Sequence, residues 1–138
     1  MILISLLISC NYIKKENKVI SKKFFEKIED FKVNNKNDII NINELIDFDF
    51  DVIYTNPPYT LMEYIKDFYG LKKLPVKKNI EYYEDRSLLL FVKDNCVIEY
   101  IEVPLNQGIH FTFDKIFKEN ARLKLENGEN WILIKKFE

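Results

Sequence analysis

The sequence predicts an α+β domain in which an antiparallel β-sheet of about five to six strands carries one or two helices packed on one face. Apolar residues recur at helical spacing in two segments of the first half, whereas the second half consists of short runs rich in β-forming residues. Two pairs of these runs flank Asp94-Asn95 and Asn127-Gly128, which are typical hairpin turns. With 138 residues, 47% of them hydrophobic, the chain has room for one such core but not for two.

The first helical segment is predicted to begin near Ser21, whose hydroxyl can cap a helix, and to run to about Phe31. Four apolar side chains of this segment share one helical face and are therefore expected to enter the core: Phe24, Phe25, Ile28 and Phe31.

The second helical segment has the clearest boundaries in the chain. Thr60 and Glu63 have the spacing of a capping box, and Gly70 offers a left-handed end. The apolar face expected to pack across the sheet consists of Leu61, Tyr64, Ile65 and Phe68.

The strands are predicted from runs of β-branched and aromatic residues and from alternating apolar positions. Asn56-Pro57-Pro58 should end the second strand, because proline cannot donate a hydrogen bond to a sheet. The predicted strands cover residues 39–42, 50–55, 88–92, 97–103, 109–113, 121–126 and 131–137.

The N-terminus is apolar up to Cys10 and almost wholly polar directly after it. Leu7-Ile8-Ser9-Cys10 resembles the bacterial lipobox, although no Lys or Arg precedes the apolar run. The resemblance implies that residues 1–9 form a signal peptide and that Cys10 carries the lipid anchor, palmitate among its acyl chains. Residues 10–20 are then expected to form a flexible tether, and 21–138 the single domain. The alternative is an N-terminal strand of a cytosolic protein.

A looser pattern extends over most of the chain. Phe48–Tyr54, the turn Pro58-Tyr59-Thr60, a helix ending at Gly70 and a hairpin beginning at Phe91 together resemble small uncharacterised bacterial lipoproteins over about residues 45–137. This resemblance implies an exported α+β domain and carries no activity.

Asn56-Pro57-Pro58-Tyr59 also resembles the motif of amino-methyltransferases that use S-adenosylmethionine, in which the Asn and the aromatic residue hold the substrate. That chemistry needs a glycine-rich cofactor turn on an earlier strand. The three glycines of this chain, Gly70, Gly108 and Gly128, all follow the motif, and the 55 preceding residues are too few for the cofactor-binding units. A rigid turn that ends a strand is the preferred interpretation.

Other chemistry-bearing residues are isolated. Asp47, Asp49 and Asp51 alternate along the chain but lack the glycine and glutamate of a calcium loop. His110 is the only histidine, and Cys96 is expected to be an inert buried thiol. We therefore expect no catalytic residue, no metal and no cofactor. The formal net charge of -1 argues against a nucleic-acid partner.

These observations predict a non-enzymatic lipoprotein of the bacterial envelope, anchored to the membrane through Cys10, which binds an envelope protein or ligand or has a structural role. Its partner surface is expected around Pro57, Pro58 and Tyr59, where tyrosine offers an aromatic anchor. Two alternatives stay open: a degenerate or truncated methyltransferase that uses Asn56 and Tyr59, and a cytosolic interaction protein of the immunity or antitoxin kind.

Overall fold

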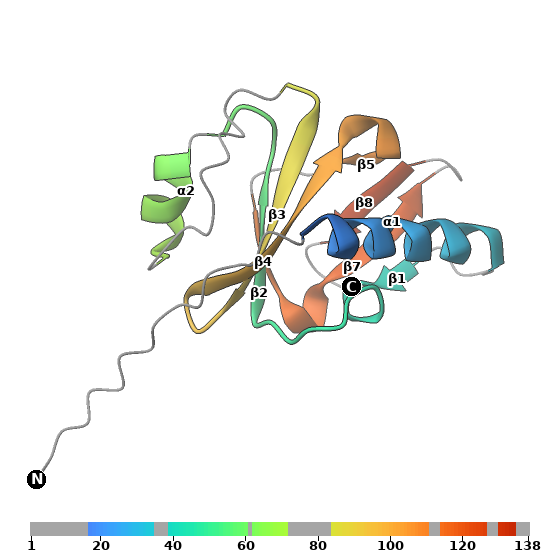
Figure 1. The fold of residues 1–138 in the computed structure, drawn as a ribbon, viewed down its shortest axis with the longest axis horizontal. Coiled ribbons are helices and arrows are strands. Elements are labelled where there is room, and N and C mark those ends of the chain that lie inside the picture. Colours follow the sequence, from blue (N-terminus) through green and yellow to red (C-terminus); the bar gives the residue numbers. More distant parts are fainter. Residues whose placement is uncertain are drawn as a thin grey trace, which may run out of the picture.

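The computed structural model describes residues 17–34, 39–60, 62–71, 84–110, 114–126 and 130–134. Within these ranges it contains two α-helices and eight strands, which form two four-stranded sheets (Figure 1). The α+β class is thus confirmed. The helices are α1 (Asn17–Asn34) and α2 (Met62–Tyr69), and the strands are β1 (Ile39–Asn41), β2 (Val52–Asn56), β3 (Arg86–Lys93), β4 (Cys96–Pro104), β5 (Ile109–His110), β6 (Asp114–Phe117), β7 (Arg122–Glu126) and β8 (Asn130–Ile134). Short 3-10 turns occupy η1 (Ile42–Glu44), η3 (Leu105–Gln107) and η4 (Lys118–Asn120).

The sheet that contains the two longest strands, here called the central sheet, has the strand order β4-β3-β2-β6 and is antiparallel throughout. Its β3–β4 hairpin turns at Asp94 and Asn95, which have φ angles of 51° and 60°. Two consecutive positive φ angles are the geometry of a type I′ turn, whose twist matches that of the strands. The predicted hairpin is therefore confirmed at its expected turn.

The second sheet has the order β1-β7-β8-β5, so the strands are divided between two sheets instead of forming one. The β7–β8 hairpin is confirmed as an antiparallel pair, and its Asn127-Gly128 turn lies outside the described residues. β5 pairs with β8 in parallel, and β1 pairs with β7, from which it is far apart in the sequence. Local patterning identifies strands and tight turns but not the distant partner of each strand.

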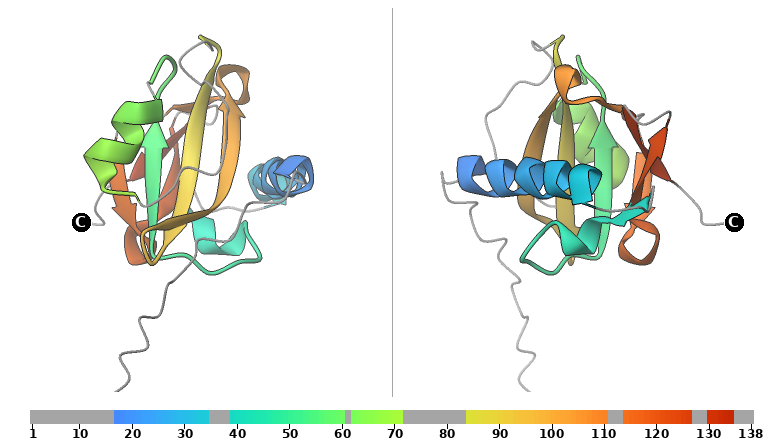
Figure 2. Two further views of the ribbon diagram at one scale, coloured as in Figure 1. Left: turned by 60° about the vertical axis from the view of Figure 1, so that its left-hand side comes forward. Right: turned by 90° about the vertical axis from the view of Figure 1, so that its right-hand side faces the viewer.

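Both faces of the central sheet are buried. Ile53, Leu89 and Phe91 face a core shared with α1 and the second sheet. Their neighbours along the strands point the other way, into a core with Ile65 of α2; they include Val52, Tyr54, Leu88, Leu90 and Val92. The two helices thus lie on opposite faces of this sheet (Figure 2), not on one face as expected. The continuous apolar run of β3 is explained by this double burial.

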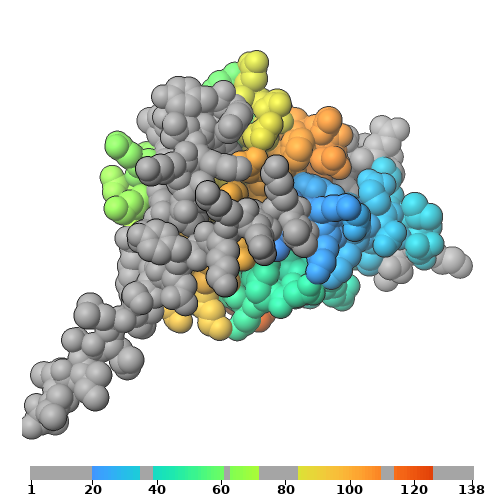
Figure 3. Space-filling model, in the orientation of Figure 1, coloured from blue at the N-terminus to red at the C-terminus, as the bar shows by residue number. Residues whose placement is uncertain are grey.

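Helix α1 is longer than predicted. It begins at Asn17, so Ser21 lies inside the helix and does not cap it, and residues 17–20 of the expected tether are helical. Phe24 and Ile28, one turn apart, are buried, while Phe25 and Phe31 pack against the same core at its edge. In the space-filling view α1 lies against the segment around residues 42–50 (Figure 3). Neither described helix is long and apolar enough to cross a membrane.

Helix α2 is described from Met62, and Thr60 before it does not form the expected capping box. Its hydroxyl donates instead to the carbonyl oxygen of Pro57 at 2.6 Å. The Thr60 side chain therefore closes the preceding turn. Leu61, which was expected on the apolar face, lies outside the described residues.

The end of α2 follows the prediction. Gly70 has a φ angle of 63°, and the amide of Leu71 donates to the carbonyl of Lys66 at 3.0 Å. Together with the Gly70 amide bond to Asp67 at 3.4 Å, this is a Schellman end. The predicted apolar face of the helix is only partly buried, because Ile65 is fully buried whereas Tyr64 and Phe68 are 51% and 59% exposed.

Candidate functional site

Asn56 ends β2 and is fully buried. Its side-chain amide donates to the carbonyl oxygens of Tyr54 and Leu88, at 3.3 and 3.4 Å. Its Oδ1 atom is also buried and makes no hydrogen bond with a described residue. The amide group of Asn56, the first residue of the motif, therefore serves as a hydrogen-bond donor to the end of the central sheet.

Tyr59 has the unusual conformation of the turn. Its φ angle is 66°, in the left-handed region that residues other than glycine rarely adopt. The ring is 58% exposed, and its hydroxyl donates to the Glu84 carboxylate at 2.7 Å. This hydrogen bond to the carboxylate is the main cause that raises the pKa of the Tyr59 phenol above its ordinary value. A strained backbone that presents an aromatic ring is a feature found more often at binding sites than at ordinary turns.

The ring of Tyr59 borders a hollow of about 640 Å³, here called the turn hollow. Its lining combines the Tyr59 turn, the segment just before β3 and the corner after β4, and the described lining residues are Tyr59, Glu84, Asp85, Pro104, Leu105 and Asn106. The amide of Leu105 donates to the carbonyl of Asp85 at 2.8 Å, which ties the last two segments together. Leu105 is 37% exposed. The hollow thus offers two apolar contact surfaces beside carboxylates.

Only part of the predicted partner surface lines this hollow. Tyr59 lines it, whereas Pro57 and Pro58 are not among its lining residues. Sequence reasoning missed Leu105 and Asn106. No local pattern could have found them, because they meet Tyr59 only when β3 and β4 pair beside β2.

The carboxylates of the turn hollow already have partners. Glu84 accepts the Tyr59 hydroxyl, and Asp85 accepts a hydrogen bond from Nε of Arg86 at 3.2 Å. The same guanidinium donates to Glu102 at 3.0 Å. The negative charge of Glu84 and Asp85 is therefore partly balanced. A ligand in the turn hollow could stack on the Tyr59 ring and donate hydrogen bonds to these carboxylates.

The three alternating aspartates serve as structural contacts. Asp49 lies between the ammonium groups of Lys93, at 2.9 Å, and Lys118. These hydrogen bonds lower the pKa of Asp49 to about 2. The other two have their own partners: Asp47 lies within 4.0 Å of Lys23 and 3.6 Å of Lys27, and Asp51 accepts the amide of Asp94 at 2.9 Å. Among the described residues no three potential ligands gather for a metal ion.

Cys96 differs from the expectation of an inert thiol. It is buried, as predicted, but it is disulfide-bonded. The sequence contains one other cysteine, Cys10, which lies outside the described residues together with the rest of the lipobox-like segment. His110 lies on β5, and its side chain is also outside the described part.

Comparisons with known protein families, with curated proteins and with solved structures found no match to this chain. Its function therefore has to be inferred from its own residues.

Proposed function

We propose that this chain is a lipoprotein of the bacterial envelope, anchored through Cys10, which binds an envelope partner at the turn hollow. The observation that carries the proposal is the lipobox-like segment Leu7-Ile8-Ser9-Cys10, with an apolar run before it and a polar segment after it. A diacylated cysteine supplies two acyl chains at one residue, which is enough for stable anchoring.

The turn hollow supports a binding role. Tyr59 and Leu105 expose apolar surface at its rim, and the strained turn holds the tyrosine ring outward. Aromatic side chains of this kind are frequent anchors of protein interfaces. Confinement to a membrane raises the effective concentration of the partner, so a weak interface at this hollow is sufficient.

The disulfide bond of Cys96 adds a requirement to the lipoprotein proposal. A sulfur atom held in a thioether to lipid cannot join a disulfide, so a lipidated Cys10 cannot pair with Cys96. The lipoprotein proposal therefore requires that Cys96 be a thiol, or be bonded outside the chain, in the anchored form. Within this chain, a disulfide between Cys96 and Cys10 and a lipid on Cys10 exclude each other, because both would use the sulfur of Cys10.

Metabolic labelling with an alkyne-bearing palmitate tests the anchor. We expect label and membrane partitioning for the native chain and for Cys96→Ala, and loss of both for Cys10→Ala. Cys96→Ala is the matched control because it removes the other cysteine without touching the lipobox. If the native chain carries no label and yields no free thiol after denaturation, the anchor is refuted and the intracellular alternatives return.

Photo-crosslinking in intact cells tests the hollow. A crosslinking residue at Asn106, which is exposed on the rim, is compared with one at Val33, which is 79% exposed on α1. Tyr59→Gly removes the ring and keeps a residue that accepts the positive φ angle. We expect a discrete envelope adduct at Asn106 that disappears in Tyr59→Gly. An adduct that persists in this variant, or forms equally at Val33, would contradict the proposed surface.

A further inference from the structure

Charge is unevenly distributed along α1. Its first segment, residues 17–23, contains no acidic residue and three lysines: Lys18, Lys22 and Lys23. The rest of the helix, residues 24–34, contains three acidic residues and two lysines and so has a net charge of -1. The basic end of the helix is the end that follows Cys10 in the sequence.

The lysines of the basic end are open to solvent. The side chains of Lys22 and Lys23 are 78% and 59% exposed, and Lys18 precedes Lys22 by about one helical turn. The Lys22 ammonium lies 3.7 Å from Glu26, and that of Lys23 lies 4.0 Å from Asp47. Because exposed ion pairs of this kind contribute little, both ammonium groups can exchange these partners for other anions.

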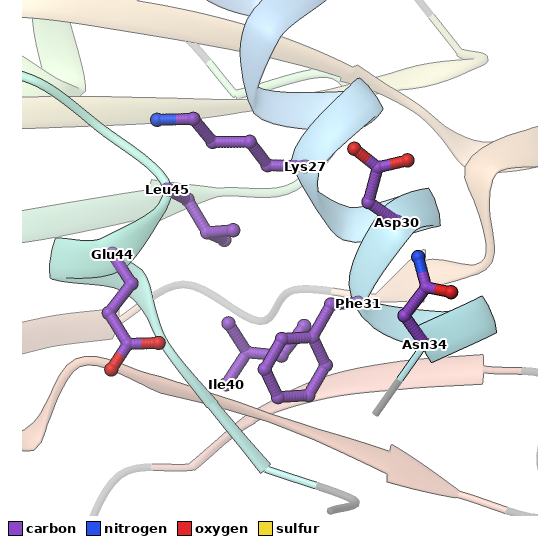
Figure 4. Close-up of a pocket in the computed structure, with 7 residues that line it drawn as sticks. All are labelled: Lys27, Asp30, Phe31, Asn34, Ile40, Glu44 and Leu45. Atoms are coloured by element: carbon purple, nitrogen blue, oxygen red, sulfur yellow. The ribbon is translucent and has the colours of Figure 1, made fainter. Parts of the chain in front are cut away.

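The far half of α1 has the opposite character. Glu29 and Asp30 are exposed there, and neither forms an ion pair with another described residue. Figure 4 shows Asp30 on this half of the helix and Glu44, also exposed, on the segment across from it. A negatively charged surface would therefore attract one end of α1 and repel the other.

The length of the chain before α1 places the basic end within reach of a membrane that holds Cys10. Asn17 follows Cys10 by seven residues, which span at most roughly 25 Å when fully extended. Glu29 and Asp30 lie about 16–18 Å beyond Lys18 along the helix axis, at a rise of ~1.5 Å per residue. The field of a charged surface fades within about 10 Å at 0.1 M salt. The lysines can thus meet the surface while the carboxylates stay beyond its field.

We propose that the basic end of α1 docks on the anionic phospholipid headgroups of the anchoring membrane, so that the helix stands away from the bilayer. This inference rests on the proposed lipid anchor. Each lysine close to an anionic membrane strengthens binding about fivefold. The formal net charge of -1 supplies no such attraction, so the uneven charge of α1 has to supply it.

Vesicle binding tests the docking surface separately from the anchor. The full chain is used as Cys10→Ala, which carries no lipid there, and vesicles containing phosphatidylglycerol are compared with vesicles of phosphatidylcholine alone at low salt. The combined change Lys18→Gln, Lys22→Gln and Lys23→Gln should weaken binding to the anionic vesicles at least about tenfold. Residues 1–9 are present in every variant, so their own attraction to lipid cancels in the comparison.

The matched control removes the same charge elsewhere. Lys32→Gln, Lys66→Gln and Lys124→Gln together change three exposed lysines outside the basic end, and this variant should bind as the parent chain does. Equal losses in both triple variants, or binding without preference for phosphatidylglycerol, would overturn the proposal. Palmitate labelling of the native chain reports on the anchor independently, so failure of the anchor and failure of the docking surface are distinguishable.

Nuclear magnetic resonance measures the orientation of the helix. In bicelles that contain phosphatidylglycerol and a lipid with a gadolinium-chelating headgroup, we expect stronger relaxation of the amides of residues 20–23 than of residues 29–33. Equal relaxation along α1, or stronger relaxation at its far end, would refute a helix that stands on its basic end.

Discussion

Replacing Asn56 with aspartate should destabilise the fold strongly. The change keeps the size of the side chain but turns a donor into an oxygen that faces the carbonyls of Tyr54 and Leu88, in a fully buried position. Loss of two hydrogen bonds costs about 1–3 kcal/mol of unfolding free energy. An ionised carboxylate without a partner in this place adds enough to bring the total to roughly 3–5 kcal/mol at pH 7.

The destabilisation should depend on pH with a definite sign. Burial and the two carbonyl oxygens raise the pKa of the new carboxyl in the folded state. The variant should therefore be most stable below the unfolded pKa of ~3.9 and should lose stability as the pH rises, until the carboxyl ionises in the folded state. Urea unfolding between pH 4 and 7, relative to the native chain, measures this loss.

Asn56→Ala is the control for this experiment. It removes the same two donors without adding a charge, so it should cost about 1–3 kcal/mol with no added pH dependence. If Asn56→Asp were as stable as the native chain at pH 7, the amide would not be committed to the sheet. The motif would then be free for a ligand, and the structural interpretation of Asn56 would be refuted.

Three further perturbations follow from the fold and the ion pairs. Gly70→Ala should lower the unfolding free energy by about 1 kcal/mol in urea titrations, because the left-handed φ angle disfavours a side chain although no atom lies within 4 Å of the added carbon; an unchanged midpoint would contradict this. Ile65→Ala should cost about 2–5 kcal/mol in the same assay, because Ile65 is fully buried between α2 and the central sheet. Asp49 has its pKa lowered from 3.8 to about 2 in the folded state. Its contribution to the unfolding free energy should therefore be present above pH 3.8 and lost as the pH falls toward 2. Asp49→Asn should remove that part of the acid dependence, and identical acid titrations of both chains would refute it.

Local interactions explain which elements the sequence could predict. The end of α2 at Gly70 and the β3–β4 hairpin at Asp94-Asn95 depend on backbone conformations that these residues favour within a few positions. The capping box predicted for the start of α2 was wrong for a related reason. The Thr60 hydroxyl had two local partners within reach, a helix amide and the Pro57 carbonyl, and it bonds to the carbonyl.

The candidate site was predictable only in part. Tyr59 was expected at a surface because it follows two prolines after a strand. Glu84 and Leu105, which complete the turn hollow, lie 25 and more residues away and carry no motif.

The sequence by itself determined the α+β class, both hairpins, the helix end at Gly70 and the expectation of a lipid anchor at Cys10, because each depends on neighbouring residues. Tertiary structure decided the division into two sheets, the placement of the helices on opposite faces and the disulfide state of Cys96. The alternation of side chains assigns residues to the two faces of a strand. Only the packing of distant strands decides that both faces of the central sheet are covered.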